Sequence, residues 1–337
     1  MNPTKTTITI LTLLLLIGCS GTSGQYTSSL TSKEIYSGKD GLTMEFFETA
    51  PPKEIFESGV LPVGIRLYNK GAYNIENGYL SLGFEKDYMT LNEGSIKSIN
   101  NKVSFRDSEH ITFELKGKDI ENPKGDEDII TFTANVNDLS KTDPQSKYHN
   151  SLVAVTSCYE YQTKAVPTVC IDSDVYGFKQ REKPCKVETL NLDSQGAPVA
   201  VTKVESEMLP SKDQPNIIKP RFIITVKNLG NGEAIKQERV EDACSSRPID
   251  YKEWNNIRAR VYLSTQEESN KLDCDIKDGA RDDGIINLRL KEDSIRCTYE
   301  PGFEEKKGTF SSPLYIVLDY GYTDTISRDV KIKKIAT

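Results

Sequence analysis

The chain has 337 residues, with 43 Lys and Arg against 50 Asp and Glu, two His, and 36% hydrophobic residues. This length suits roughly two domains of average size better than one large core. The formal net charge of −7 repels nucleic-acid phosphates, so no nucleic-acid partner is expected. Because His110 and His149 are the only histidines, a Ser-His-Asp hydrolase or a histidine-based zinc site has almost nothing to be built from.

The N-terminal segment has the composition of an export signal. Residues 1–9 carry one Lys and no acid, and residues 10–17 are apolar apart from Thr12. This run is too short to span a bilayer, which needs about 20 apolar residues. It ends at Leu16-Ile17-Gly18-Cys19, which resembles the lipobox of bacterial and archaeal lipoproteins. The resemblance implies that residues 1–18 are removed and that a lipid on Cys19 anchors the mature chain to the membrane. An ordinary signal peptide with a cysteine nearby is the alternative.

Residues 19–40 follow as a predicted flexible tether. They are rich in Ser, Thr and Gly and contain too few apolar residues to bury a core. No later segment approaches the length of a membrane-spanning helix, so we expect residues from Gly41 onward to be extracytoplasmic.

Six further cysteines are expected to form three disulfides, because an even number in an exported chain favours a disulfide framework. They are Cys158, Cys170, Cys185, Cys244, Cys274 and Cys297. Residues 152–161 and 165–171 read as two strands around a Gln-Thr-Lys turn, and this hairpin predicts a Cys158–Cys170 bond. For the rest, proximity in sequence favours Cys185–Cys244 and Cys274–Cys297. A zinc site is the weaker alternative, because these cysteines lack the close spacing of a zinc knuckle.

Most of the body reads as short strands. Apolar residues alternate with polar ones, and Gly, Pro, Asn and Asp interrupt the pattern about every ten residues. The clearest strands are residues 63–68, 79–84, 110–115, 129–136, 222–226, 257–263 and 315–320. Helical periodicity is scarce, with one short turn expected near residues 250–256. The predicted class is all-β.

An internal repeat is visible in this pattern. A strand runs into Asn-Lys-Gly at residue 69 and into Asn-Leu-Gly at residue 228, a separation of 228 − 69 = 159. Residues 158–161 align with residues 319–322, and residues 169–171 align with residues 330–332, both at a separation of 161. Two copies of one module are therefore predicted, at residues 41–179 and 180–337. The Asn-x-Gly segments are interpreted as tight turns in which Asn and Gly tolerate positive φ, rather than as ligand sites.

These features together resemble a family. A strand, an Asn-x-Gly turn and a second strand, in tandem behind a lipobox, are similar to the immunoglobulin-like β-sandwich modules of archaeal and bacterial surface lipoproteins, the CARDB and S-layer-associated group. The sequence at residues 41–46, 51–52, 69–73 and 195–201 is similar to that of uncharacterised membrane-anchored proteins of small-genome archaea. The resemblance implies two tandem immunoglobulin-like sandwiches and a cell-surface location, and it supplies no catalytic residues. This chain departs from a simple tandem array in insertions at residues 232–256 and 265–285.

The second-module insertion contains the candidate partner-binding residues. Tyr251 and the single Trp254 could anchor a partner, although Trp in an all-β domain is more often part of the core. An acidic run at Asp273, Asp275, Asp278, Asp282 and Asp283 invites a calcium interpretation. The spacing does not match an EF-hand, so a solvated loop is preferred and no metal or cofactor is predicted. The Gly125–Asp128 segment is interpreted in the same way, as a turn.

No catalytic motif stands out. The sequence lacks a Gly-rich phosphate loop, a Gly-x-Ser-x-Gly elbow and a His-Glu-x-x-His helix. We therefore expect a non-enzymatic, lipid-anchored protein that acts as a spacer and protein-binding platform, as an accessory subunit of a surface or envelope assembly. The alternative is a free-standing adhesive or ligand-binding lipoprotein that recognises glycans or solutes.

Overall fold

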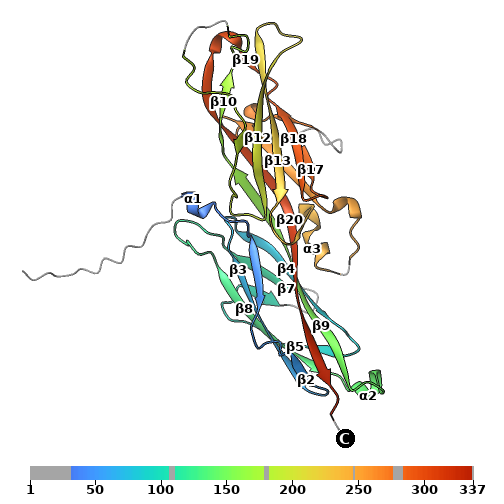
Figure 1. Ribbon diagram of the computed structural model, residues 1–337. Coiled ribbons are helices and arrows are strands. Elements are labelled where there is room, and N and C mark those ends of the chain that lie inside the picture. Colours follow the sequence, from blue (N-terminus) through green and yellow to red (C-terminus); the bar gives the residue numbers. More distant parts are fainter. Residues whose placement is uncertain (1–31, 106–110, 178–181, 246, 276–283, 336–337) are drawn as a thin grey trace, which may run out of the picture.

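A computed structural model describes residues 32–105, 111–177, 182–245, 247–275 and 284–335. The described chain is all-β, as predicted: antiparallel sheets form sandwich-like layers, and the helices are single turns. The body is elongated, with α1 (Ser32–Ile35) beside its middle and the C-terminal end of the chain at one tip (Figure 1). Each predicted strand falls on an observed one, except that His110 lies outside the described residues.

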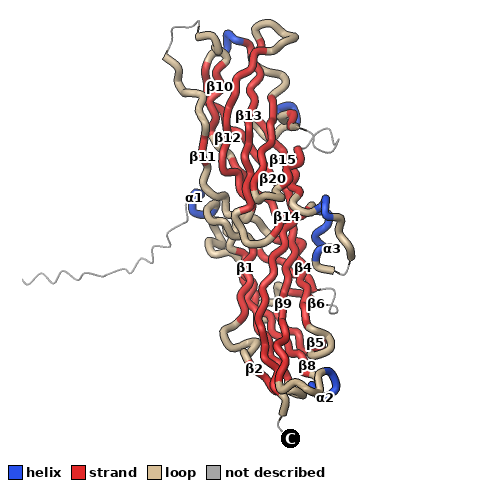
Figure 2. Tube along the Cα trace, turned by 45° about the vertical axis from the view of Figure 1, so that its right-hand side comes forward, coloured by secondary structure: helices blue, strands red, loops and turns tan. Residues whose placement is uncertain are grey.

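Three sheets build the body, which consists mostly of strands (Figure 2). The first contains, in order, β1 (Leu42–Phe46), β3 (Val60–Asn69), β8 (Glu127–Val136) and β5 (Met89–Ser98). The central sheet contains β17 (Gly284–Asn287), β15 (Asn256–Leu263), β20 (Thr309–Lys333), β9 (Tyr148–Ala165), β4 (Ile75–Phe84), β7 (Ile111–Leu115) and β6 (Val103–Phe105). On β20 it also carries β2 (Glu54–Phe56), β10 (Thr168–Asp172) and β14 (Glu233–Ile235). The third sheet contains β11 (Leu190–Asn191), β12 (Val199–Pro210), β13 (Ile217–Asn228), β18 (Glu292–Thr298) and β16 (Asp273–Cys274), with β19 (Phe303–Glu304) on β13.

The helical turns lie in the connections between strands. Besides α1 they are α2 (Leu139–Thr142), α3 (Val240–Ala243) and the 3-10 turns η1 (Gln237–Arg239), η2 (Tyr251–Glu253), η3 (Glu268–Asn270) and η4 (Glu305–Lys307).

One antiparallel ribbon, formed by β9 and β20, runs the length of the body (Figures 1 and 2). It extends from Tyr148 opposite Lys333 to Ala165 opposite Ile316, and β10 then continues along the remaining residues of β20. β9 and β10 thus act as one strand interrupted at residues 166–167, where Pro167 has no N–H to donate. The 25 residues of β20 correspond to about 80 Å at the usual rise of a strand.

This ribbon crosses the predicted boundary between the two modules. The C-terminal half of β20 pairs with β9 and β2 beside the first sheet, whereas β10 pairs with the start of β20 beside the third. The buried apolar residues of both halves form one contiguous core. The division of the chain into two domains at residue 179 stays a prediction.

The predicted Cys158–Cys170 bond is wrong, and the ribbon gives the reason. The expected Gln-Thr-Lys turn is ordinary strand, with Gln162 opposite Asp319. Cys158 and Cys170 are twelve residues apart along an extended chain, about 40 Å, whereas bonded cysteines need Cα atoms within about 7 Å.

The three observed disulfides are Cys158–Cys244, Cys170–Cys185 and Cys274–Cys297. The Cys274–Cys297 prediction is therefore confirmed, and the two cysteines face each other across β16 and β18. The predicted Cys185–Cys244 bond is wrong, because Cys185 follows β10 closely in the chain and bonds to it.

The internal repeat reappears as matched strand pairing. β1 pairs with β3 with Leu42 opposite Asn69, and β12 pairs with β13 with Val199 opposite Asn228. Next in each sheet, β3 pairs with β8 and β13 pairs with β18. The first copy ends with β9 and its continuation β10, the second copy ends with β20, and these strands pair with each other.

The Asn-x-Gly segments are also matched in detail. The Asn69 amide donates to the Tyr73 carbonyl and its Oδ1 accepts from Gly71 N. Asn228 makes the same two bonds, to Gly232 O and from Gly230 N. The prediction that these glycines are needed for a positive φ is wrong, because neither Gly71 nor Gly230 has a positive φ.

The glycines are needed because tyrosines approach them closely. A Cβ on Gly71 would lie 1.7 Å from the hydroxyl of Tyr161, and one on Gly230 would lie 2.3 Å from that of Tyr322. Both hydroxyls are satisfied there: Tyr161 donates to the Gly196 carbonyl, and Tyr322 donates to Asn228 Oδ1.

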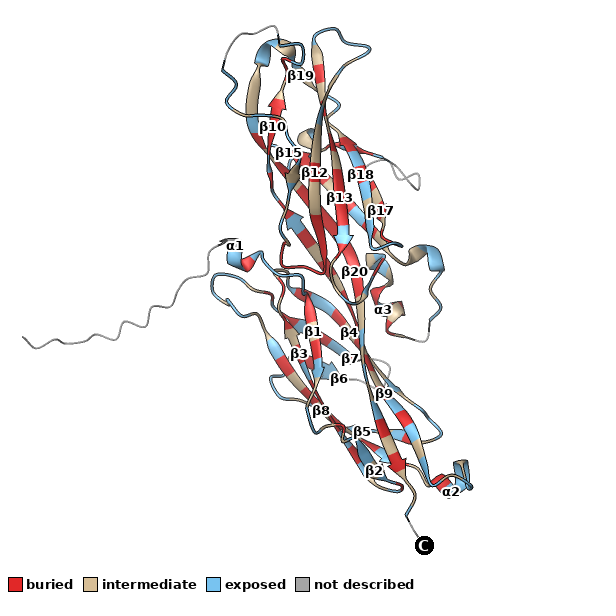
Figure 3. Ribbon diagram, in the orientation of Figure 1, coloured by how far each residue is buried: buried red, intermediate tan, exposed pale blue. Residues whose placement is uncertain are grey.

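Two more tyrosines complete a buried cluster at the centre of the ribbon. The Tyr159 hydroxyl accepts from Leu42 N, and the Tyr320 hydroxyl accepts from Val199 N. All four tyrosines are almost fully buried. They lie at the middle of the ribbon, where β20 is buried from residue 316 to residue 322 (Figure 3). This burial raises the pKa of each of the four phenols well above its usual range.

The last residues of the predicted tether pack against this central region. Ile35 is buried, and Gly38 exchanges hydrogen bonds with Ser194 Oγ and Gly196 N. The expected free tether therefore makes its first described contacts before Asp40. Cys19 lies outside the described residues.

Candidate functional site

The insertion of the second half folds over the outer face of the central sheet. We call residues 232–256 the strap; it contains β14, η1, α3 and η2. Under it lies a small apolar cluster separate from the main core, made by Cys158, Ile235, Val240 and Cys244. Gly321 gives the strap its close approach, because a Cβ there would lie 2.4 Å from Val240 Cγ2 and 2.7 Å from Ile235 Cγ2.

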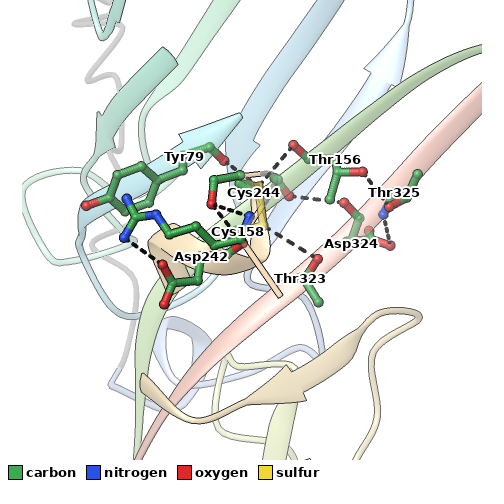
Figure 4. The surroundings of a disulfide bond; sticks show 11 residues. Tyr79, Thr156, Cys158, Asp242, Cys244, Thr323, Asp324 and Thr325 are labelled. Atoms are coloured by element: carbon green, nitrogen blue, oxygen red, sulfur yellow. Dashed lines mark hydrogen bonds and ion pairs between the residues drawn. A yellow bond between two sulfur atoms is a disulfide. The ribbon is translucent and has the colours of Figure 1, made fainter. Parts of the chain in front are cut away.

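A disulfide fastens the strap to the ribbon. Cys244 follows α3 and bonds to Cys158 of β9, beside Tyr79 of β4 and Thr323 of β20 (Figure 4). Burial raises the pKa of the neighbouring Tyr79 phenol, and it also raises that of the Asp324 carboxyl. Sequence reasoning missed this bond because the two cysteines are 86 residues apart.

Ion pairs hold the strap in its own shape. Asp242 is 6% exposed and lies between two guanidinium groups, with Arg239 Nη1 at 2.7 Å and Arg247 Nη1 at 2.8 Å. Arg239 also pairs with Glu253 at 3.0 Å, which links η1 to η2. The strap is thus a fixed element rather than a loose loop.

The two predicted partner-binding residues both lie at the end of the strap but differ in exposure. Trp254 is half-buried, packs against the apolar cluster and forms an isolated bridge with Ile235. Tyr251 is 68% exposed. The structure therefore leaves the tyrosine, and not the tryptophan, as the aromatic side chain presented to solvent.

A neighbouring turn extends the surface around Tyr251. Between β17 and β18, Leu288 is buried while Leu290 is 90% exposed. The guanidinium carbon of Arg289 lies 5.6 Å from the Tyr251 ring centroid, and Lys252 Nζ lies 5.9 Å from it. We call Tyr251, Lys252, Arg289, Leu290 and Lys291 the Tyr251 patch.

Sequence reasoning missed Leu290. The alternation Leu288-Arg289-Leu290-Lys291 misleads, because residues i and i+2 of an extended segment lie on the same face and both leucines would be expected in the core. The chain instead turns here, with Lys291 N donating to the Leu288 carbonyl, and Leu290 faces solvent.

An open groove of about 470 Å³ lies between the strap and the β4–β5 connection. Its lining includes Ser81, Gly83, Met89 and Cys244. Lys86 and Glu93 are the only charged residues among the described residues that line it. A ligand in the groove would therefore contact mainly uncharged side chains and backbone, and few groups there could act as an acid or a base.

In the described parts of the two predicted acidic loops, the carboxylates form ion pairs and hydrogen bonds within the protein. Asp275 pairs with Arg296 at 3.6 Å, whereas Asp278, Asp282 and Asp283 lie outside the described residues. Asp126 pairs with Lys102 at 2.9 Å, and Asp128 accepts from Asn100 N and Lys102 N. Within the described ranges, no cluster of three or more His, Cys, Asp or Glu side chains could hold a metal ion.

The sequence matches no protein-family model, and no curated protein matches it.

Three disulfides are consistent with an extracytoplasmic location. No helix in the part of the chain that the structure describes is long and apolar enough to cross a bilayer.

Proposed function

We propose that this protein is a non-enzymatic, lipid-anchored extracytoplasmic spacer and protein-binding platform, an accessory subunit of a surface or envelope assembly. The observation that carries the proposal is the β9–β20 ribbon, which extends through both halves of an elongated body. A spacer has to hold its partner at a fixed distance from its anchor, and a continuous paired ribbon is suited to that task.

The contacts at the centre of the ribbon support a rigid spacer. The two halves of the chain are joined there by backbone bonds from Ala72 N to Gly196 O and from Gly196 N to Gly38 O. The Tyr161 hydroxyl adds a bond to Gly196 O. Bending between the halves would break these bonds and disrupt the packing of the four buried tyrosines.

The start of the described chain and the strap lie on opposite sides of the body. α1, which leads back toward Cys19, lies on one side of the middle, and α3 lies on the other (Figures 1 and 2). A chain anchored through Cys19 could therefore present the strap and the Tyr251 patch away from its anchor. This arrangement supports a platform for a partner.

Membrane fractionation with Cys19→Ala tests the anchor. The wild-type chain is expected in the membrane fraction and the variant in the soluble extracytoplasmic fraction, where both retain three disulfides. Retention of the variant in the membrane would overturn the lipid anchor.

Native gel filtration after mild detergent extraction tests the platform. A complex of reproducible stoichiometry that is larger than the monomer supports an assembly subunit. Recovery of the wild-type chain as a monomer would favour the free-standing ligand-binding lipoprotein, and binding to glycan arrays would then be measured.

A further inference from the structure

The Tyr251 patch presents three exposed cations close together. Lys252, Arg289 and Lys291 are all exposed, and none of the three forms an ion pair with a described carboxylate. Neighbouring acids are otherwise engaged: Glu253 pairs with Arg239, and Glu292 pairs with Lys227. Asp250 and Asp293 are also engaged, as acceptors of the backbone N–H groups of Lys252 and Ser294. The three cations are therefore exposed without a described carboxylate partner.

The same surface exposes two large apolar side chains. Leu290 is 90% exposed and Tyr251 is 68% exposed. A single exposed leucine is ordinary. The combination of leucine, tyrosine and arginine beside unpaired lysines is instead the composition of the residues that contribute most to binding energy at protein interfaces.

The patch is also held in place before any partner arrives. Leu288 N donates to Asn255 O, and the Asn287 amide donates to Asn256 Oδ1, so the β17–β18 turn is tied to the end of the strap. Asp250 caps η2 by accepting from Lys252 N. A fixed surface loses less conformational entropy on binding than a mobile one.

We infer that the Tyr251 patch binds a protein partner through an acidic segment that also carries apolar side chains; this inference rests on the proposed platform function. Carboxylates of the partner complement Lys252, Arg289 and Lys291, and its apolar side chains cover Tyr251 and Leu290. Anionic lipid has the same charge preference. Partner protein is favoured over lipid because the strap, which carries Tyr251 and Lys252, has its helix α3 on the side of the body opposite α1 (Figures 1 and 2).

Photo-cross-linking in native membranes tests the inference. A benzophenone amino acid replaces Leu290 in the full-length, lipidated chain, and the cross-linked peptides are identified by mass spectrometry. The expected product is one partner protein, linked through a segment with an excess of Asp and Glu. A lipid adduct, a segment without such an excess, or no adduct at all would overturn the inference.

Charge reversal supplies the second readout. Arg289→Glu with Lys291→Glu is expected to lower the cross-link yield about tenfold or more, because like charges then face each other. The matched control reverses two exposed lysines on other loops, Lys186→Glu with Lys212→Glu, and should leave the yield within twofold. Reversing the partner's acids to Lys should restore the yield with the Arg289→Glu and Lys291→Glu chain. Equal yields from the patch variant and the control would also overturn the inference.

The two proposals fail in different ways. If the detergent-extracted complex persists at full size in the Arg289→Glu and Lys291→Glu chain, the platform function stands and the patch is not its contact. If the wild-type chain is a monomer and Leu290 gives no cross-link, both fail.

Discussion

Glu160 and Gly321 face each other at the centre of the β9–β20 ribbon, and they are equivalent residues of the two repeats. A residue that pairs with its own equivalent lies on a local two-fold axis. The two halves of the chain are thus arranged like the subunits of an isologous dimer, with one strand of each extending into the other. The strap breaks this symmetry because it contacts the two residues differently. Its Val240 and Ile235 side chains pack on Gly321, whereas its Gln237 side chain donates a hydrogen bond to Glu160.

The four buried tyrosines predict that stability falls at high pH. Their phenol pKa values are raised in the folded state, so the unfolded chain loses these protons first as the pH rises through about 10. The stabilisation is therefore complete below pH 10 and is lost above it. Each tyrosine that stays protonated only in the folded state contributes about 1.4 kcal/mol per pH unit to this fall.

Urea unfolding between pH 8 and pH 11.5 measures this slope. Tyr161→Phe should make the fall shallower by about 1.4 kcal/mol per pH unit, whatever its effect at neutral pH. Tyr36→Phe, at a 50% exposed position, is the control. An unchanged slope in Tyr161→Phe would contradict the assignment.

Gly71→Ala is expected to destabilise the fold by about 3 kcal/mol, because its Cβ would lie 1.7 Å from the Tyr161 hydroxyl and 2.7 Å from Gly196 O. Chemical denaturation measures the change. Gly94→Ala is the control, since its nearest neighbouring atom would be 3.8 Å away, and its effect should stay within about 0.5 kcal/mol. Similar losses in both variants would mean that the approach of Tyr161 is not the cause.

The contact between the ribbon and the strap predicts coupling between Gly321 and Val240. Gly321→Ala alone should cost about 1–3 kcal/mol through the clash with Val240 Cγ2. Val240→Ala removes the clashing methyl, so the double variant should lose about 1 kcal/mol less than the sum of the single variants. Additive losses in the denaturation cycle would show that the strap moves freely away from Gly321.

The disulfide that fastens the strap closes the longest loop of the three. Non-reducing digestion should release peptides that link Cys158 with Cys244, and a peptide linking Cys158 with Cys170 would refute the observed connectivity. Replacing Cys158 and Cys244 together with Ser should cost up to about 4.5 kcal/mol, from the loop of 86 residues. The Cys170 and Cys185 pair closes 15 residues and should cost up to about 3 kcal/mol.

Local patterns were sufficient to predict the strands and the repeat, but not the pairing of distant strands. Alternation of apolar residues identified β3, β8 and β13, because each buries one face in the core. The interpretation of residues 162–164 as a turn failed because the partner of that strand is β20, some 157 residues away, and no local feature indicates it.

The candidate site was predictable only in part for the same reason. Tyr251 stood out as an aromatic residue in a long insertion. Its surroundings did not, because Arg289 and Leu290 come from the connection between β17 of the central sheet and β18 of the third sheet, which lies beside Tyr251 only in the folded chain. The disulfide of Cys244 likewise depends on where the strap crosses β9.

The extension of β20 into the first half sets the order in which the protein can be completed during synthesis. Leu152 pairs with Asp329, which the ribosome adds 329 − 152 = 177 residues later. At about 5–20 residues per second, the first half waits roughly 10–35 s for its neighbouring strand. During that time the side of β9 that β20 will occupy is an open strand edge. Newly made chains truncated before residue 321 should therefore be the ones that depend most on a chaperone.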